Sequence, residues 1–542
     1  MTRYTRLLAL VFGSFLTGGI TLLAQAPSDA LRNMSEGTGG TARAQAMGGT
    51  IGALGADPSA IVTNPAGSAL FYKGSISFSF DADGNYYYPY IDTRQPHEAG
   101  SKWSAGLSGA SFISSPMGGG SSPWSFNYGL IYNRDYDYTR SYGINFEMPN
   151  STVSDFMAFR ANAAGVPWEE YMYEGDSYDP ILVSGLDPIV VMGMNSGIIE
   201  YDGDLQRFQP GAWSWSGEPE VSDMVFLLPN VSNLTVHERG TKNSFDFNVS
   251  GSYDSRLFFG ASLRMGTSHF TRNSEYTEEF YYEPKDNEIN LTYDNDLSVS
   301  GSTFGLNLGL LYALGDYGRV GISYLAPQYG RYEELYHASA GTYNNAIIGD
   351  PDMGYNTGDD LSNSYSMWLP GKLTLSGMAF LGRWGMVTYD FTWRNLSSAK
   401  LNGGNGDPAL EGPNELMDAY FGNEFGHHLG VEVVPTSWLS LRAGASYLTS
   451  GVRLQSDRAV LSEEYVASGT ILDFALPRGS YTASAGLGLR FGAFSADFAY
   501  VYGLQKNEVY PYPANPIENF SVEGANMDID RHSLFGTLTL TF

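Results

Sequence analysis

The segment 139–241 contains the residues whose types and spacing best suit ligand binding. Its two apolar runs, "SDFMAFRANAAGVPWEEYM" and "DPIVVMGMNSGII", supply a candidate groove: Phe156, Met157, Phe159, Arg160, Ile189, Val191 and Met192. Asp155 is the expected N-cap of a helix that places the first run on one face. Two interpretations remain open. The residues form an apolar groove, in which flexible Met side chains adapt to ligands of many shapes, or they form the small core of the loop itself.

Arg160 has the same two interpretations at the level of a single side chain. Its guanidinium could meet a carboxylate head group, or it could form an ordinary surface ion pair with an acidic neighbour. The other chemically active patterns are weaker. His427 and His428 are adjacent, and adjacent side chains of a strand point to opposite faces, so the two do not chelate one metal. Acidic loops such as "DNDLS" could hold Ca²⁺, but they lack the spacing of an EF-hand.

Catalytic and cofactor-binding patterns are missing from the sequence. It contains neither G-x-S-x-G nor H-E-x-x-H, and it has no cysteine that could serve as a nucleophile or a thiolate ligand. We therefore predict that the protein is not an enzyme and holds no cofactor and no metal.

The start of the chain predicts export. Arg3 and Arg6 precede an apolar stretch from Leu7 to Leu23 that ends in small residues, which is typical of a cleaved signal peptide over residues 1–24. No later stretch approaches the roughly 20 apolar residues of a transmembrane helix. Without Arg3 and Arg6 the chain has 28 basic and 58 acidic residues, so it is a poor candidate for binding nucleic acid.

Composition and alternation predict a barrel in a bacterial outer membrane. Charged residues make up 16% of the chain, whereas Gly (65), Tyr (38) and Phe (30) are abundant. In the last ten residues, "SLFGTLTLTF", apolar residues alternate with mostly polar ones, as in a strand with one apolar face. The same alternation recurs upstream, as in "FDFNVSGSY" and "FSADFAYVY".

Fourteen segments show this pattern, and an even number is typical of a closed bacterial barrel. They lie near 74–82, 102–114, 123–138, 242–254, 256–271, 297–314, 317–333, 366–381, 384–399, 426–434, 437–450, 478–491, 493–505 and 530–542. Short connections such as "LGDYG" and "RFGAF" alternate with long ones, the largest at 139–241. Sorting of loops by length favours a 14-stranded antiparallel transmembrane β-barrel over residues 74–542.

Residues 25–73 precede the first predicted strand and contain the stretch "ADPSAIVTNPAGSALF", which consists mainly of small and apolar residues and has two prolines. A barrel of fourteen strands is too wide for its own side chains to fill. Glycines allow close backbone approach, and Pro58 and Pro65 fix turns. We therefore expect residues 25–73 to lie in the lumen as a small hatch.

The hatch segment resembles a known family. "TARAQAMGGTIGALGADPSAIVTNPAGSALF" is similar to the N-terminal region of the FadL family of outer-membrane transporters for long-chain fatty acids and other hydrophobic compounds. The matching residues are Arg43, Gly48, Gly49, Asp57, Pro58, Ser59, Ala60, Asn64, Pro65 and Ala66. The resemblance implies capture of a ligand by outer loops, an apolar pocket in the lumen, movement of the hatch, and sideways exit through an opening at a kinked strand.

Function and partners follow as expectations. The leading hypothesis is uptake of long-chain fatty acids or other hydrophobic compounds, and the alternative is a barrel that docks or shuttles secreted proteins at the cell surface. The expected surroundings are outer-membrane lipids and lipopolysaccharide. Phe542 resembles the carboxy-terminal signal that the barrel-assembly machinery recognises. A general aqueous porin fits less well, because an apolar hatch would obstruct its lumen.

Overall fold

The computed structural model describes residues 26–37, 39–90, 100–118, 122–147, 151–183, 185–211, 229–282, 287–343, 352–358, 361–404, 410–453, 469–513 and 524–542. The predicted signal peptide, residues 1–24, lies outside the described residues. Among the residues that the structure describes, no helix is long and apolar enough to cross a membrane.

Antiparallel strands form one closed barrel, because the first strand pairs with the last: Ser75 of β1 is opposite Thr541 of β22. Closure leaves no unpaired edge inside the lipid. The barrel strands are β1 (Ser75–Tyr90), β2 (Gly100–Ile113), β4 (Trp124–Asp137), β8 (Val231–Tyr253), β9 (Leu257–Tyr282), β10 (Asn287–Ala313), β11 (Gly318–Leu325) continued by β12 (Gln328–Tyr343), β15 (Lys372–Phe380) preceded by β14 (Leu361–Leu369), β16 (Gly385–Asn395), β18 (Asn423–Thr436), β19 (Leu439–Leu448), β20 (Phe474–Phe491), β21 (Phe494–Tyr510) and β22 (Ala525–Thr541). The prediction of a 14-stranded antiparallel β-barrel is confirmed.

Two neighbouring strands are interrupted at prolines, which cannot donate to the ladder. Pro327 separates β11 from β12, and Pro370 separates β14 from β15, while pairing continues on both sides of each break. Shorter strands extend the rims: β3 (Met117–Gly118), β5 (Arg140–Glu147), β13 (Met353–Asn356) and β17 (Lys400–Gly403). A separate hairpin consists of β6 (Ile199–Asp202) and β7 (Arg207–Pro210).

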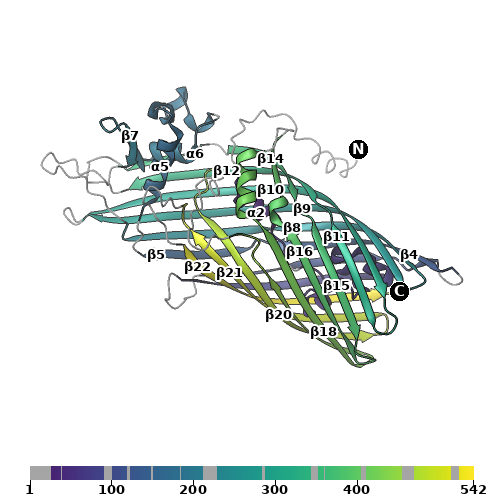
Figure 1. Ribbon diagram of the computed structural model, residues 1–542. Coiled ribbons are helices and arrows are strands. Elements are labelled where there is room, and N and C mark those ends of the chain that lie inside the picture. The colour runs from purple at the N-terminus through teal and green to yellow at the C-terminus, as the bar shows by residue number, and fades with distance from the viewer. Residues whose placement is uncertain are drawn as a thin grey trace, which may run out of the picture.

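The strands exceed their predicted bounds mainly at one end of the barrel. The short turns lie where the sequence placed them, at the end that also holds the C-terminus (Figure 1); we name it the turn end. At the opposite, loop end, β8 begins at Val231 instead of residue 242, and β9 continues to Tyr282 instead of residue 271. The segment 139–241 therefore contains strand as well as loop.

The extra length was missed because the two faces of each strand exchange polarity along the barrel. Near the turn end of β10 the apolar side chains are exposed outward: Phe304, Leu306, Leu308, Leu310 and Tyr312. Near its loop end the apolar side chains are buried inward: Ile289, Leu291, Tyr293, Leu297 and Val299. Outward positions there carry polar residues such as Asp294 and Asp296. The first zone presents an apolar band to lipid, as in transmembrane barrels, and the second encloses its own apolar core in water.

Helices cover the loop end. They are α5 (Val153–Ala164), α6 (Pro188–Asn195) and α7 (Glu411–Tyr420), with the 3-10 helices η2 (Trp168–Tyr171), η3 (Gly175–Ser177), η4 (Pro180–Leu182) and η7 (Leu396–Ser398). Figure 1 shows α5 and α6 beside the loop end of the long strands. They pack on the apolar core of the loop end through Phe156 and Ile189, both fully buried.

The N-terminal segment runs inside the barrel from one end to the other. It forms α2 (Pro27–Met34), α3 (Ala42–Ala46), α4 (Ala60–Thr63) and the 3-10 helix η1 (Pro65–Leu70). Helix α2 contacts α7 and β14 near the loop end, α3 contacts β19 to β22, and η1 contacts β8, β9 and β10 near the turn end. The segment therefore has wall contacts on opposite sides of the lumen.

Candidate functional site

Asp57 organises the centre of the N-terminal segment. Its Oδ1 accepts hydrogen bonds from the Thr41 hydroxyl at 2.8 Å and from the Ser59 backbone N–H at 2.9 Å. Thr41 also caps α3 by accepting from the Ala44 N–H at 3.2 Å. Burial raises the pKa of Asp57 above its ordinary value, although the charge of Arg43 opposes the rise. One carboxylate thus ties the start of α3 to the turn that Pro58 begins.

Asn64 and Pro65 fit closely against the wall. The Asn64 Oδ1 accepts from the Ala66 N–H at 3.2 Å and caps η1, while its Nδ2 donates to the Leu310 carbonyl at 3.3 Å. A Cβ on Gly309 would lie 2.0 Å from the Asn64 Oδ1, so β10 needs a glycine at this point. The Asn-Pro-Ala stretch is therefore shaped to the inner face of the strands next to it.

Gly48 and Gly49 adopt φ values of 67° and 80°, in the left-handed region that glycine enters without steric cost. The Gly48 carbonyl lies 3.0 Å from Nδ1 of His428. A Cβ on Gly444 would lie 2.1 Å from the Gly48 nitrogen, so the backbones nearly touch. His427 points the other way and contacts the Tyr389 hydroxyl at 2.8 Å, as adjacent strand residues must.

Arg43 anchors the segment to a chain of charges on the wall. Its Nε and Nη2 donate to the two carboxylate oxygens of Glu432, both at 3.0 Å. Glu432 also accepts from Arg442 at 2.5 Å, and Arg442 donates to Asp497 at 2.6 Å. A bidentate pair fixes direction as well as charge. Burial lowers the pKa of Arg43, but the charges of Glu432 and Asp57 together outweigh that effect and raise it above its ordinary value.

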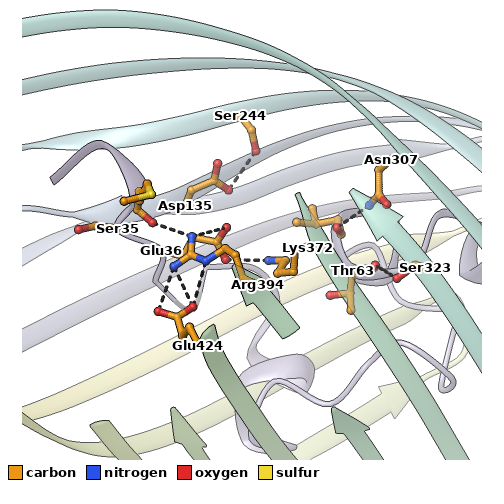
Figure 2. A network of polar contacts seen from close by, with 12 residues as sticks. Ser35, Glu36, Thr63, Asp135, Ser244, Asn307, Ser323, Lys372, Arg394 and Glu424 are labelled. Carbon is orange, nitrogen blue, oxygen red and sulfur yellow. Dashed lines mark hydrogen bonds and ion pairs between the residues drawn. The ribbon is translucent and has the colours of Figure 1, made fainter. Parts of the chain in front are cut away.

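Glu36, two residues after the end of α2, forms a second anchor (Figure 2). Its carboxylate accepts from Lys372 Nζ at 2.7 Å and lies 3.2 Å from Arg394 Nη1. Arg394 in turn makes a bidentate pair with Glu424 at 3.0 and 3.1 Å, and donates to the Met34 carbonyl at 2.7 Å. Burial would raise the pKa of Glu36, but the charges of Lys372 and Arg394 hold it well below its ordinary value.

Two cavities adjoin at this anchor. The cavity nearer the loop end, which we name the upper cavity, has a volume of 250 Å³, lies against α2 and has both apolar and charged walls. Its apolar wall includes Leu31, Met34, Phe270, Leu396, Ile471 and Phe474. The lower cavity, of 310 Å³, lies between the N-terminal segment and the wall and is lined largely by polar and charged side chains. Glu36, Arg394 and Glu424 line both cavities, so the anchor stands at their junction.

The lower cavity reaches a break in the barrel wall. Among the described residues, β2 pairs with β4 only from Gly109–Ile113 to Gly129–Asn133. Beyond that point β4 bulges between Arg134 and Tyr136 and pairs with β8 alone. Asp135 and Arg140, which line the lower cavity, lie at this break. A strand without a partner on one side is a place where the wall can open.

Arg134 occupies the break. Its guanidinium forms ion pairs with Asp81 and, at 3.5 Å, with Asp83 on β1, and it lies 3.6 Å from Asp137. It passes beside Gly106 of β2, where a Cβ would lie 3.1 Å from its Nη1. A charged side chain therefore fills the space that a backbone ladder fills elsewhere.

The predicted groove residues lie in the loop end but are buried. Phe156, Met157, Ile189, Val191 and Met192 have no exposed surface and belong to the apolar core there. In this conformation they pack against the protein itself and present no open groove.

The polar residues of the same loop pair with one another. Arg160 Nε donates to the carboxylate of Asp187 at 2.5 Å, and both residues belong to the loop. Of the two interpretations of Arg160, this contact favours the ion pair. Helix α5 begins one turn earlier than expected, because Thr152 is its N-cap and Asp155 reaches back to the Thr152 N–H at 2.9 Å. The prediction of Asp155 as N-cap was wrong.

Sequence reasoning missed the residues of the Glu36 anchor. No motif joins Glu36, Lys372 and Arg394, which come from the N-terminal segment, β15 and β16. The one available signal was the alternation of inward and outward residues along β16. Arg394 lies on the same face of that strand as the inward residues Thr388 and Asp390.

No protein-family model matches this chain, and neither does any curated protein sequence. Among solved structures, a FadL homologue of Pseudomonas aeruginosa is similar at a TM-score of 0.51 and 13% identity, covering 94% of this chain and 99% of that one. The Pseudomonas putida toluene transporter TodX is similar at a TM-score of 0.47 and 14% identity, covering 94% and 100%. The Ralstonia pickettii toluene transporter TbuX is similar at a TM-score of 0.43 and 13% identity, covering 94% and 100%. The chain therefore shares the fold of the FadL homologue.

Proposed function

We propose that this protein is an outer-membrane transporter that takes up hydrophobic or amphipathic small molecules. The observation that carries the proposal is the pair of adjoining cavities inside the barrel, which extend from α2 at the loop end to the break between β2 and β4. The fold shared with a FadL homologue supports it. Residues 25–73 act as a movable hatch, and the loop end faces the cell exterior.

A ligand enters at the loop end and moves through the upper cavity to the lower one. Each CH₂ group kept from water contributes about 0.8 kcal/mol, so an acyl chain favours the apolar wall beside Phe270 and Phe474. The lining of the lower cavity contains more polar and charged residues than the resemblance implied. Exit is sideways, past Arg134, into the membrane.

Fatty acids and other amphiphiles are the expected substrates. TodX and TbuX are toluene transporters, and aromatic compounds are therefore the first class to compare with fatty acids. Phe156, Met157, Phe159, Arg160, Ile189, Val191 and Met192 remain candidates for first capture, which would require the loop core to open. The barrel-assembly machinery, outer-membrane lipids and lipopolysaccharide are the expected partners, with Phe542 as the assembly signal.

The test is uptake of labelled oleate by cells that lack the gene and carry either the wild type or Gly106→Leu. The new side chain is directed at Arg134 and fills the break, so uptake is expected to fall about tenfold. Gly377→Leu is the matched control, because no atom lies within 4 Å of a Cβ built there.

Three outcomes separate the hypotheses. Unchanged uptake in Gly106→Leu excludes the break as the exit. No uptake by the wild type, of oleate or of toluene, defeats the transporter proposal. Unchanged uptake after gene deletion, together with loss of secreted protein from the cell surface, supports the docking alternative.

A further inference from the structure

The Glu36 anchor has the form of a carboxylate-binding site that the protein fills with its own side chain. Two cations from adjacent wall strands, Lys372 on β15 and Arg394 on β16, converge on one carboxylate. That carboxylate belongs to the N-terminal segment and not to the wall (Figure 2). The wall thus supplies the positive charge, and the segment supplies the negative one.

Without Glu36, the positive charges at the anchor outnumber the negative ones. Arg394 keeps a bidentate partner in Glu424 whether or not Glu36 is present. Within the part of the chain that the structure describes, Lys372 has Glu36 as its one ion-pair partner. Removal of Glu36 therefore leaves the site with one unneutralised positive charge, on Lys372. A single carboxylate from another molecule would neutralise that charge.

The anchor is also accessible from the cavities. The side chains of Glu36 and Lys372 remain 33% and 28% exposed, and Glu36 lines both cavities. The apolar wall of the upper cavity begins at Met34, two residues from Glu36, and continues through Leu396. A molecule with a carboxylate at the junction can therefore place an apolar tail along that wall.

We propose that Lys372 and Arg394 bind the carboxylate of an amphipathic monocarboxylic acid, and that Glu36 occupies this site as an internal substitute when the acid is absent. The inference rests on the proposed transport function and specifies its substrate class. Exchange of one carboxylate for another keeps the charge balanced, so Lys372 always has an anionic partner.

Displacement of Glu36 also releases the chain on both sides of it. The Met34 carbonyl accepts from Arg394, and the Gly37 N–H donates to the Asp135 carbonyl at 2.8 Å, at the bulge beside the break in the wall. Arrival of a ligand carboxylate is thereby connected to the strand at which the wall can open. Neutral hydrocarbons do not compete for Lys372 and do not trigger this release.

The test compares dodecanoate with dodecanol, which has the same tail and no charge, on the full mature protein in lipid nanodiscs. Glu36→Gln removes the competing carboxylate. It is expected to increase the affinity for dodecanoate about tenfold and to leave the affinity for dodecanol little changed. Lys372→Gln is expected to lower the affinity for dodecanoate about tenfold and to leave the affinity for dodecanol unchanged. Glu432→Gln is the control: it loosens the Arg43 anchor, which lines neither cavity, and leaves the ratio of the two affinities unchanged.

A second readout follows the segment itself. The chain has no cysteine, so Ser35→Cys gives a single site for maleimide labelling. Dodecanoate is expected to increase the labelling rate, and dodecanol is not. Binding of both compounds with the same affinity ratio in wild type and Glu36→Gln overturns the inference while the transport proposal stands. If neither the wild type nor any variant binds either compound, both the inference and the transport proposal are overturned.

Discussion

At the scale of single residues, ion pairs hold the N-terminal segment in place through partners that lie far away in the sequence. Arg43 with Glu432, and Glu36 with Lys372, each join the segment to a wall strand. The pair of Arg43 with Glu432 is bidentate and therefore directional, and removal of Glu432 leaves the Arg43 guanidinium without that partner. The segment is therefore held at defined points and not by apolar burial alone.

The pKa of Glu36 predicts a pH dependence of this attachment. Because the folded-state pKa is depressed, the stabilisation is fully present above the ordinary carboxyl pKa of about 4.3 and is lost as the pH falls below it. The difference in melting temperature between wild type and Glu36→Gln, followed by gel mobility after heating, is expected to stay constant from pH 7 to about pH 5. It is expected to shrink below about pH 4. A difference that grows as the pH falls contradicts the prediction.

At the scale of elements, close backbone contact decides how the segment fits the wall. Glycines in β10 and β19 leave room for the backbone of the segment, as Gly309 does for Asn64 and Gly444 does for Gly48. Side chains at these points would require the segment or the strand to move. The fit thus depends on glycine in both partners.

Gly444→Ala tests this fit, because its Cβ would lie 2.1 Å from the Gly48 nitrogen. We expect the turn after α3 to be displaced, at a cost of about 1–3 kcal/mol, with steady ion-conducting openings in planar bilayers. Gly377→Ala, which meets no atom within 4 Å, is expected to conduct as little as the wild type. Equal conductance of the two variants would show that the contact at Gly48 does not seal the lumen.

The elements themselves were predictable to different degrees. Alternation and turn residues predicted all fourteen strands and the positions of the short turns, because both signals are local. The loop-end extensions of β8 and β9 were missed, because polarity changes sides there while the strand continues. The bends at Pro327 and Pro370 carry a plain signal in the sequence, since proline removes a ladder hydrogen bond.

At the scale of the whole molecule, one barrel passes through two solvents. Toward the turn end its outward side chains are apolar and its lumen is polar. Toward the loop end the outward side chains are polar and the interior is apolar. The exchange of faces along continuous strands sets the height of the lipid boundary on the barrel.

This arrangement predicts different responses to an introduced arginine at two positions on one face of β9. Leu263→Arg places a charge in the apolar band, at a cost of about 2–4 kcal/mol in folding into lipid vesicles. Asn273→Arg lies ten residues along the same face, in the polar zone next to Asp296, and is expected to be neutral within about 0.5 kcal/mol. The measurement is the urea midpoint of each variant. Equal midpoints would place both residues on one side of the lipid boundary.

The sequence by itself determined the barrel, its strand number, the sorting of its loops and the existence of a glycine-rich segment ahead of the first strand. These features depend on neighbours within a few residues, which periodicity reports directly. Only the tertiary structure decided which side chains meet in the lumen. Glu36 and Lys372 are 336 residues apart, and no local pattern brings them together. Closure of the sheet around the N-terminal segment brings the two side chains together inside the lumen, and the two cavities with their charged junction exist only after that closure.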